Sequence, residues 1–567
     1  MASLVLGMLV IAGPAAAGNG HGNGPKPKKD NDTHVQLLAI NDFHGNLAPP
    51  SGSSGRISVG PGQTVDAGGA EYLSTHIKQL RDRNSNTITV GAGDLIGASP
   101  LLSGLFHDEP TIEAMNAMGI DVSSVGNHEF DEGIDELLRM QNGGCHPVDG
   151  CQDGTPFGGA LFQYLAANVV RDSGGENPLP PYEVEKIGNA KIAFIGLTLQ
   201  GTPLIVTPSG VAGLTFLPEA ATINSLVEQL RRDQGVRSFV VLIHQGGQQN
   251  APYANGFQDV NRCDNFTGDI APIVEALDPQ VDLVVSAHTH QPYICEINGI
   301  PVTSASSFGR LITDIDLVID HQTKDVKSVE AHNVIVTRDV PKDPAITKII
   351  DHYTEFEQPI ANRVVGSITE DITKSQNDAG ESALGDVIAD AQLEATAPSD
   401  FGGAVVAFMN PGGIRADLTY NPLTNGQVTY NDLFTVQPFA NTMAVETLTG
   451  AQIYAVLEEQ WAGSNATTFP KVLQVSDGFT YTWDANAPLG SRVVPGSAAI
   501  DGVAVDPLAS YRVAMNNFLQ TGGDGFSTFT QGTDLLGGDI DVDTAVAYFQ
   551  AHSPVAPGPQ NRITRLN

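Results

Sequence analysis

Residues 37–46 read Leu-Leu-Ala-Ile-Asn-Asp-Phe-His-Gly-Asn, a stretch in which an apolar run ends and two metal-ligand side chains follow at once. The run Val35–Ile40 has the length and composition of a buried strand, and Asp42 and His44 come directly after it. An Asp-x-His pair on its own is more commonly an ordinary turn at the end of a strand. The pair indicates a metal site only if other strands of the chain also end in metal-ligand residues.

Two more predicted strands end in polar side chains of the same kinds. Thr87–Val90 is followed by Asp94, and Val122–Val125 is followed by Asn127 and His128. The second of these could also be the start of a helix, because Asn is a good capping residue and an acidic residue favours the first turn. Open α/β sheets carry their sites at the carboxyl ends of the strands, so we expect these side chains to converge.

The pattern recurs twice further along the chain. Phe239–Ile243 runs into His244, and Val281–Val285 runs into His288 and His290. A His-x-His pair on a strand places both rings on one face, although buried histidines without a metal are more common. Carboxylate oxygens mixed with imidazoles suit a pair of divalent ions such as Zn, Mn, Fe or Co rather than Ca or Mg alone. Five strand ends of this kind in one chain favour the metal-site interpretation.

The balance of charges narrows the possible partners. The chain of 567 residues carries 29 Lys and Arg against 64 Asp and Glu, which gives a net charge of −35. Binding to a nucleic-acid backbone requires a basic surface, so the composition argues against that class of partner. The length allows about two to four domains. The hydrophobic share of 41% is typical of a soluble globular protein.

Residues 1–17 predict a signal peptide, because the apolar run Leu4–Ala12 is followed by Pro14 and small residues suited to cleavage, although no basic region precedes the run. Residues 18–33, rich in Gly, Asn, Pro, Lys and Asp, are expected to be disordered. No later stretch reaches the roughly 18 apolar residues that a membrane span needs. We therefore expect no membrane span and a mature protein that is secreted to the extracellular space, or that is periplasmic or associated with the cell wall.

Four cysteines allow three disulfide pairings. Cys145 and Cys151 are close in sequence and enclose a small loop, which favours a bridge between them and leaves Cys263 and Cys295 for the second. Export makes disulfides expected. A structural zinc site is the alternative, but the spacing fits no common zinc pattern.

Strands and helices alternate from residue 34 to 340, which predicts a layered α/β domain that carries the metal site. Its amphipathic helices are expected at Glu71–Arg83 and Pro110–Met118, and Lys191–Leu197 predicts a further strand. The alternating run Gly309–Leu317 predicts a half-exposed or edge strand.

Residues 341–362 predict a single helix, which we interpret as a linker to a second domain at 363–567. The apolar face of this helix consists of Ile346, Ile349, Ile350, Tyr353 and Phe356. The second domain has a different composition, with a helix expected at Glu381–Thr396 and a strand at Ala404–Met409.

Two glycine-rich loops of the second domain suggest a small-molecule pocket. Residues 410–415 read Asn-Pro-Gly-Gly-Ile-Arg, and residues 517–526 read Asn-Phe-Leu-Gln-Thr-Gly-Gly-Asp-Gly-Phe. Each loop alone could be a tight turn, because glycine permits positive φ. Together with the exposed-looking Gln-Pro-Phe at 437–439, which adds an aromatic ring, they favour a binding site.

These motifs resemble a known family. The blocks of the first domain occur in the order found in calcineurin-like metallophosphoesterases, and the chain from about residue 34 to 535 resembles the exported two-domain 5′-nucleotidase and UDP-sugar hydrolase family. In the second domain the matching blocks are Glu381–Gly385, Asn410–Arg415 and Gly522–Phe526. The resemblance implies an α/β fold with an N-terminal layered β-sandwich flanked by helices, a linker helix, and a C-terminal α+β domain that binds the nucleotide substrate.

The resemblance also implies a role for each motif residue. One metal would be held by Asp42, His44 and His290 and the other by Asn127, His244 and His288, with Asp94 bridging the two. His128 would stabilise the charge that builds on phosphorus, and Asp131 would orient it. The substrate would be bound by Phe439 and Phe518 on the two faces of a base, by Asn410 and Arg415 at its polar groups, and by Asp524 at the ribose hydroxyls.

Two positions depart from the family pattern. His290 stands where these nucleotidases often have Gln or Asn, and residues 375–380 lack the arginines that usually precede the Glu-Ser-x-Leu-Gly block. The implied function is a secreted hydrolase that removes phosphate from nucleotides, foremost 5′-nucleotides, by attack of a metal-activated water. The alternatives are a 2′,3′-cyclic-nucleotide phosphodiesterase with 3′-nucleotidase activity, a UDP-sugar hydrolase, and a non-catalytic nucleotide-binding surface protein. The intact pair of His128 and Asp131 argues against the last.

Overall fold

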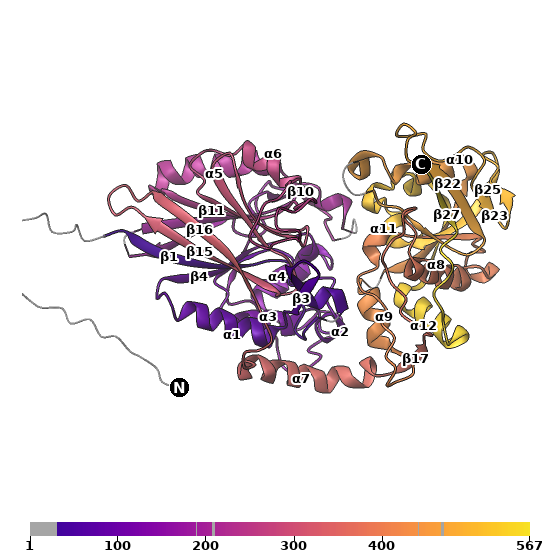
Figure 1. Cartoon of the computed structure of the whole chain (residues 1–567), viewed down its shortest axis with the longest axis horizontal. Coiled ribbons are helices and arrows are strands. Elements are labelled where there is room, and N and C mark those ends of the chain that lie inside the picture. Colours follow the sequence, from indigo (N-terminus) through magenta and orange to yellow (C-terminus); the bar gives the residue numbers. More distant parts are fainter. Residues whose placement is uncertain (1–30, 51, 189, 207–209, 440, 467–469) are drawn as a thin grey trace, which may run out of the picture.

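The computed structural model describes residues 31–567 with the exception of residues 51, 189, 207–209, 440 and 467–469. Two lobes lie side by side and are joined by helix α7 (Pro344–Ala361), which runs beneath both of them in Figure 1. The predicted signal peptide and most of the predicted disordered segment 18–33 lie outside the described residues. Thr33, the last residue of that segment, is the first residue of a strand, so the predicted boundary is wrong by one residue.

The first lobe is built on two six-stranded sheets. In spatial order, the first sheet contains β16 (Val326–Ile335), β15 (Leu311–Ile319), β1 (Thr33–Ile40), β4 (Thr87–Ala92), β5 (Val122–Ser124) and β6 (Gln163–Leu165). The second contains β13 (Pro292–Ile297), β14 (Ile300–Ala305), β12 (Leu283–Ser286), β11 (Ser238–His244), β9 (Ala190–Thr198) and β8 (Tyr182–Ile187). The site-bearing strands β1, β4 and β5 are parallel in the first sheet, as are β11 and β12 in the second. Their carboxyl ends therefore lie at one edge of each sheet.

The two sheets pack face to face. Leu37 and Val90 of the first sheet and Val240 and Val285 of the second are buried in one apolar cluster between them. The outer face of the first sheet is covered by α1 (Ala70–Arg81), α3 (Glu109–Met118) and α4 (Ile134–Asn142), and that of the second by α5 (Glu219–Gln234) and α6 (Ile270–Glu275). Two short hairpin-like pairs, β2 (Arg56–Gly60) with β3 (Gln63–Asp66) and β7 (Val169–Arg171) with β10 (Leu214–Phe216), lie outside the sheets. This arrangement is the layered β-sandwich flanked by helices that the resemblance implied.

The run Gly309–Leu317 forms strand β15 with the predicted alternation of buried and more exposed side chains. Of the two predicted alternatives, a half-exposed strand or an edge strand, it is not the edge strand. Its inward residues Leu311 and Ile315 are buried while Asp316 is exposed, as expected for a half-exposed strand. However, β15 lies between β1 and β16, so β16 forms the edge of the sheet. The side chains of β16 are exposed or half-buried except that of Asn333, so its sequence lacks a buried apolar face.

The second lobe combines small sheets with helices. Its five-stranded sheet has the order β21 (Gln474–Val475), β18 (Val406–Met409), β25 (Ser510–Asn516), β20 (Thr442–Thr449) and β26 (Thr533–Ile540). A four-stranded sheet contains β24 (Val503–Ala504), β23 (Ala499–Ile500), β22 (Phe479–Asp484) and β27 (Ile563–Leu566), and β17 (Val364–Ser367) pairs with β19 (Gln427–Thr429). The helices are α8 (Ala383–Thr396), α9 (Tyr430–Val436), α10 (Gly450–Glu459), α11 (Asn517–Gln520) and α12 (Asp541–His552). Helix α8 begins two residues later than predicted, because Ser382 caps it by accepting a hydrogen bond from the Gly385 N–H.

Helix α7 packs mainly against the first lobe, through α1, α2 (Leu101–Gly104) and α3, and it also contacts α9 of the second lobe. Ile346 and Tyr353 of the predicted apolar face are buried. Phe356, the last residue of that face, is 41% exposed. The fold class is confirmed, while the domain limits at 340 and 363 stay predictions.

Both favoured disulfides are formed, one between Cys145 and Cys151 and the other between Cys263 and Cys295. They leave no unpaired cysteine in the described part of the chain. Among the residues with described positions, no helix combines the length and the apolar character that crossing a bilayer requires.

Candidate functional site

The five predicted strand ends converge at the carboxyl edges of the two sheets. Asp42 and His44 follow β1, Asp94 follows β4, Asn127 follows β5, His244 is the last residue of β11, and His288 and His290 follow β12. Five of these residues have left-handed backbone conformations, with φ of 49° at Asp42, 48° at His44, 49° at Asp94, 72° at His288 and 58° at His290. Such conformations cluster where a site requires side chains to turn inward abruptly.

Backbone hydrogen bonds connect the loops that follow β1 and β4. The Asp42 N–H donates to the Gly93 carbonyl at 3.1 Å, and the His44 N–H donates to the Asp94 carbonyl at 3.0 Å. The loop after β5 approaches so closely that a Cβ at Gly126 would lie 2.2 Å from Asp94 Oδ1. Only glycine fits there, which explains the first residue of the Gly-Asn-His-Glu block.

Glu129 ties the second and third loops together. Its buried carboxylate accepts hydrogen bonds from the Asp94 N–H at 2.9 Å and the Leu95 N–H at 2.8 Å, and also from the N–H of Gly126. Glu129 has no predicted functional role, although its position directly after His128 in the Gly-Asn-His-Glu block at residues 126–129 was a signal. A carboxylate that accepts three N–H groups from two loops fixes the position of Asp94.

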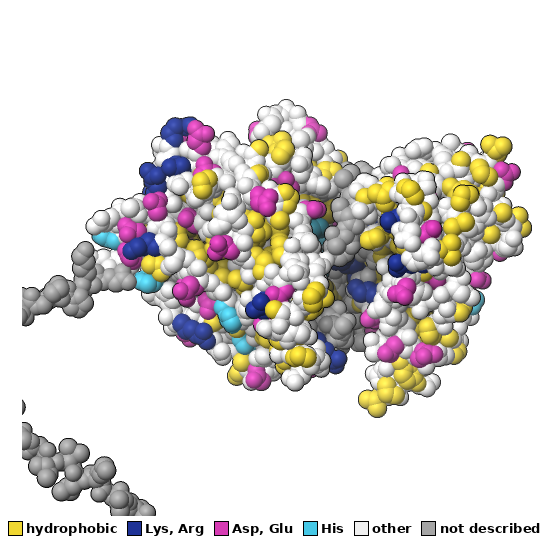
Figure 2. Space-filling view, turned by 45° about the horizontal axis from the view of Figure 1, so that its top comes forward, with side chains coloured by type: hydrophobic (Ala, Val, Ile, Leu, Met, Phe, Trp, Pro, Cys, Tyr) yellow, Lys and Arg dark blue, Asp and Glu magenta, His cyan; other side chains and the backbone are white. Residues whose placement is uncertain are grey.

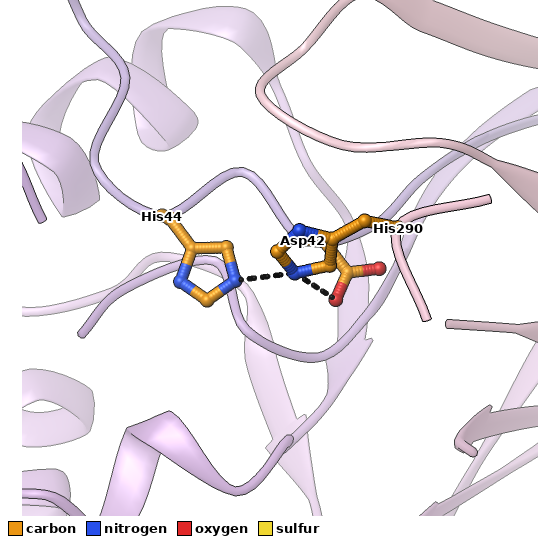
Figure 3. Close-up of side chains that lie close together, drawn as sticks. All are labelled: Asp42, His44 and His290. Atoms are coloured by element: carbon orange, nitrogen blue, oxygen red, sulfur yellow. Dashed lines mark hydrogen bonds and ion pairs between the residues drawn. The ribbon is translucent and has the colours of Figure 1, made fainter. Parts of the chain in front are cut away.

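Asp42, His44 and His290 form the first cluster of possible metal ligands (Figure 3). His44 Nε2 lies 3.1 Å from His290 Nε2, which in turn lies 3.4 Å from Asp42 Oδ1. Three ligand atoms at such separations surround a space of the size that a divalent ion occupies, since metal–ligand distances are about 2.0–2.2 Å for zinc.

Asp94, His244 and His288 form a second cluster, with ligand atoms within 4.8 Å of one another. Asp94 Oδ2 lies 2.9 Å from His244 Nε2 and 3.6 Å from His44 Nε2. The carboxylate therefore stands between the two clusters, as expected of a bridging ligand.

The protonation of the histidines suits metal binding. His44 and His244 direct Nδ1 to the carbonyl oxygens of Gly97 and Ala92, at 2.8 Å and 2.9 Å, so that Nε2 faces the site. Burial lowers the pKa of His44 and His290, and it lowers that of His288 to about 3, so these rings are neutral at neutral pH. Neutral imidazole oriented by a second hydrogen bond is the form that ligates metals.

Two buried polar atoms also point to a missing partner. Within the described part of the structure, Asn127 Oδ1 and His244 Nε2 are buried and have no hydrogen bond of good geometry. Burial lowers the pKa of His244, but the carboxylate of Asp94 outweighs burial and raises the pKa to about 9. Both atoms belong to the predicted ligand set. A divalent ion would satisfy them and would replace the proton that His244 otherwise carries, so the residues present fit the implied metals.

His128 and Asp131 form a hydrogen-bonded pair beside these clusters. His128 Nδ1 lies 2.8 Å from Asp131 Oδ2, which leaves Nε2 as the nitrogen that can face a substrate. Burial lowers the pKa of His128, but Asp131 and Asp94 outweigh burial and raise it above its usual value. The carboxylates of Asp131 and Asp94 therefore favour the protonated, hydrogen-donating form of the ring.

A pocket lies in the furrow between the lobes, where basic side chains are visible in Figure 2. It has a volume of about 850 Å³, counted with the solvent at its mouth. The first lobe contributes Asn127, His128, Asp131, Ile205, Val206 and His288 to its wall. The second lobe contributes all five predicted substrate-binding residues, Asn410, Arg415, Phe439, Phe518 and Asp524, together with Gly412, Gly413, Asn441 and Lys471. One cavity thus unites residues from both halves of the chain.

Phe439 reaches across to His128 of the first lobe, and Arg415 lies over the Phe439 ring. The Phe439 ring lies 5.6 Å from that of His128, at an interplanar angle of 21°. The Arg415 guanidinium lies 5.6 Å from the centre of the same Phe439 ring. Gln437, by contrast, is buried, so the expectation that the whole segment 437–439 is exposed is wrong.

Asp524 is held by Asn410, a predicted site residue, and by Lys471, which the sequence did not indicate. Its Oδ2 accepts a hydrogen bond from Asn410 Nδ2 at 3.0 Å, and its Oδ1 pairs with the ammonium group of Lys471. Asn516 Nδ2 donates to Asn410 Oδ1 at 3.0 Å and so completes the row. Lys471 lies 53 residues from Asp524 in sequence, and no motif marks it. None of residues 375–380, all of which the structure describes and where the family pattern has arginines, lines the pocket.

Comparisons with known proteins agree with this arrangement. Residues 35–292 match the family described as calcineurin-like phosphoesterase, and residues 364–531 match the family described as 5′-nucleotidase, C-terminal domain. The chain is 33% identical over 551 residues to cell wall protein Lmo0130 of Listeria monocytogenes, covering 91% of this chain and 67% of that protein. It is 32% identical over 538 residues to endonuclease YhcR of Bacillus subtilis; the match covers 93% of this chain but only 41% of the length of that relative.

Among solved structures, a 5′-nucleotidase precursor from Thermus thermophilus superimposes with a TM-score of 0.74 at 24% identity. The superposition covers 94% of this chain and 100% of that chain, which shows that both lobes share its fold.

Proposed function

The chain belongs to the calcineurin-like phosphoesterases that carry a 5′-nucleotidase C-terminal domain, a family of phosphoric ester hydrolases, and from this premise we propose that it is a metal-dependent phosphohydrolase of nucleotides, foremost of 5′-nucleotides. One observation carries the proposal. The pocket between the lobes has His128, Asp131 and two of the predicted metal ligands, Asn127 and His288, on one wall, and aromatic and polar residues on the other. A phosphate group and a nucleoside attached to it would fill these two parts.

The phosphate end of the substrate belongs at the two histidine and carboxylate clusters. Two divalent ions held there would polarise the phosphoryl oxygens and activate the attacking water. Asp94 stands between the clusters, and Glu129 fixes the backbone on which Asp94 is carried. These residues set the separation and orientation of the phosphorus and its attacker, which is the larger part of phosphoryl-transfer catalysis.

His128 acts on the reacting group from the second-lobe side of these clusters. Because Nδ1 is engaged by Asp131, Nε2 is left to donate a hydrogen bond to an oxygen that gains negative charge. A protonated imidazole at that position stabilises the charge and can deliver a proton to the departing ribose oxygen.

The nucleoside end belongs to the second lobe. Phe439 and Phe518 offer aromatic faces, and stacking on them tolerates different bases because every base has a π-face. Asp524 faces the same cavity and can accept hydrogen bonds from ribose hydroxyls, while Arg415 supplies positive charge near the phosphate. A non-catalytic nucleoside binder has no need for the buried histidine and carboxylate clusters.

A second candidate function is hydrolysis of 2′,3′-cyclic nucleotides. The cations that line the pocket are Arg415 and Lys471, and Lys471 is already paired with Asp524. Apart from the proposed metal ions and His128, the pocket has little uncompensated positive charge, which suits the single charge of a cyclic phosphodiester better than the double charge of a phosphomonoester.

We also propose that the protein is exported. The apolar run Leu4–Ala12, the two disulfides, and the similarity to a protein called a cell wall protein support this proposal. Fractionation of the native host, with an antibody to the folded chain, tests it. Recovery from the cytoplasm alone would contradict export.

The function is tested by the hydrolysis products released from AMP, ATP, 3′-AMP, 2′,3′-cyclic AMP and UDP-glucose, with Mn²⁺ or Zn²⁺ and with a chelator. The products are separated by chromatography, so that ring opening and diester cleavage, which free no phosphate, are detected as well. Bis-(p-nitrophenyl) phosphate serves as a substrate without a base. Metal-dependent release led by AMP is the expected result. Release led by the cyclic substrate would establish the second candidate, and no release from any substrate would contradict both.

A further inference from the structure

A second group of metal-ligand side chains lies in the first lobe and uses none of the predicted catalytic ligands. It is formed by His107, which directly precedes Asp108 at the start of α3, by Glu132, and by His146 in the disulfide loop. One ligand atom of each lies within 4.8 Å of the others. The rings of His107 and His146 are stacked, with centroids 3.8 Å apart and an interplanar angle of 15°.

A fourth donor stands beside these three. Asp149 Oδ2 lies 2.9 Å from His107 Nε2 and 3.4 Å from His146 Nδ1. His107 Nδ1 lies 2.7 Å from Glu132 Oε2 on its other side. Two imidazoles and two carboxylates are thus gathered from three separate segments of the chain.

We propose that His107, Glu132 and His146 form a binding site for a divalent cation of the zinc class, with Asp149 orienting His107 through its other ring nitrogen. Three nitrogen and oxygen donors leave one position of a four-coordinate zinc ion for water. Nitrogen ligands of one tetrahedral zinc ion lie about 3.4 Å apart, given metal–nitrogen distances of about 2.0–2.1 Å. Because the two stacked rings are nearly parallel and their lone pairs lie in the ring planes, one ring must turn out of the stack to bind the same ion.

The alternative explanation is a network of ion pairs without a metal. Burial lowers the pKa of His107, but its hydrogen bonds to Glu132 and Asp149 outweigh burial and raise the pKa to about 9. In the metal-free protein a proton therefore occupies the place of an ion, and zinc must displace it. The exchange gains ligands, because a divalent ion can accept a nitrogen from each ring and an oxygen from Glu132, while the proton serves His107 alone.

The surroundings hold the donors in place and leave a path from solvent. The Cys145–Cys151 disulfide closes the loop that carries His146 and Asp149, and the Gly150 N–H donates to the His146 carbonyl at 2.9 Å. The side chains of His107 and His146 are 16% and 14% exposed. The loop is therefore preorganised, and its ligands remain accessible to an ion from solution.

The site adjoins the segments that position the catalytic groups. Glu132 directly follows Asp131, the partner of His128. On the other side Asp108, next to His107, accepts a hydrogen bond from the Gly97 N–H at 2.9 Å, and the Gly97 carbonyl accepts one from His44. An ion bound here would fix both segments from outside the pocket and would stabilise the loops that carry the catalytic residues.

The test is the zinc content of the full chain, measured by mass spectrometry after loading with zinc and dialysis against metal-free buffer. We expect His146→Ala and the isosteric Glu132→Gln each to hold one zinc equivalent fewer than the parent protein. The control His321→Ala removes an exposed histidine from a turn remote in sequence and should match the parent. If His146→Ala fails to fold, the Glu132→Gln variant alone tests the prediction.

The same comparison in an Asp94→Asn background separates this site from the catalytic one. There the Glu132→Gln substitution should still remove one zinc equivalent, and zinc should raise the melting temperature more when Glu132 is retained than when it is replaced. Equal zinc content in the parent, His146→Ala and Glu132→Gln proteins would overturn the proposal. That outcome would leave the nucleotidase proposal untouched, since phosphate release is measured separately.

Discussion

The imidazole of His128 stacks on the ring of Phe439, with centroids 5.6 Å apart and planes inclined by 21°. The first residue belongs to the lobe that carries the metal-ligand clusters and the second to the lobe that carries the glycine loops. The contact brings the group predicted to act on phosphorus against a ring predicted to bind the base. It explains why the two halves of the chain can share one pocket, and it guides the choice of variants.

Replacement of His128 by alanine tests the assignment of the acid. We expect His128→Ala to lower turnover by about 10²- to 10⁴-fold, the usual contribution of a general acid. Metal content should stay unchanged, because His128 is not one of the predicted metal ligands. Asp94→Asn is the matched contrast, since it should lose both turnover and bound metal. Unaltered turnover in His128→Ala would remove this residue from the mechanism.

The base-stacking role is best tested at Phe518, because Phe439 contacts His128 and its loss would disturb catalysis as well. Phe518→Ala should raise the KM for AMP roughly 10- to 100-fold, as expected for the loss of about 1–3 kcal/mol of stacking. Ribose 5-phosphate, which has no base, should keep its KM. A parallel rise for both compounds would show that the substitution acts on something other than base binding.

Glu129 is a positioning residue whose effect should appear in metal affinity. Glu129→Gln replaces one acceptor oxygen by an amide that faces backbone N–H groups, so the loops after β4 and β5 lose part of their connection. We expect metal affinity to fall about 10- to 100-fold, as is common for residues that orient ligands. Titration calorimetry on the apoprotein measures this directly. The exposed Glu176→Gln is the control, and equal affinities in both variants would contradict the role.

The two disulfides should differ in their contribution to stability. They span 32 and 6 residues, and a longer closed loop loses more entropy in the unfolded chain. Removal of Cys263 and Cys295 together should cost about 3–4 kcal/mol and removal of Cys145 and Cys151 about 2–3 kcal/mol. Denaturant unfolding of the two double-alanine variants compares them. A larger loss for the shorter loop would indicate that local contacts dominate over chain entropy.

Asp541, at the start of α12, should make stability depend on pH. Burial raises its pKa from 3.8 to about 7, so the folded chain binds a proton more tightly than the unfolded chain does. Stability therefore falls as pH rises from about 4 to about 7 and then levels off. Asp541→Asn removes this loss, and its advantage in melting temperature should grow over the same range. An advantage that is constant with pH would mean that Asp541 is ionised in the folded state.

The sequence predicted the site better than it predicted the contacts around it. Ligand types at strand ends are local signals, because the strand and the residue after it are contiguous, and so Asp42, Asp94 and His244 could be placed at one edge in advance. Lys471 and the His128–Phe439 stack depend on segments far apart in the chain, and periodicity carries no information about such pairs.

The features that the pattern of apolar residues did not predict also have physical causes. Phe356 lies on the apolar face of α7 but beyond the part of the helix that the first lobe covers, and so it is exposed. The strand β26 reads Thr-Asp-Leu-Leu-Gly-Gly-Asp-Ile, and all of its side chains are exposed. A strand whose side chains are all exposed needs no hydrophobic pattern, so the pattern of apolar residues could not predict β26.

The left-handed backbone at Asp42, His44, Asp94, His288 and His290 limits how this centre can change during evolution. Asp, Asn and His adopt that conformation several-fold more readily than other residues with a side chain, and β-branched residues hardly at all. The residues that bind metals well are thus also those that the backbone permits. Asp, Asn, His and Gly fit these five positions most readily, Gln is a further residue that the family uses at position 290, and Thr, Val and Ile are strongly disfavoured. A homologue with a different metal preference would have to use this restricted set of residue types, or would need loops with a different backbone conformation.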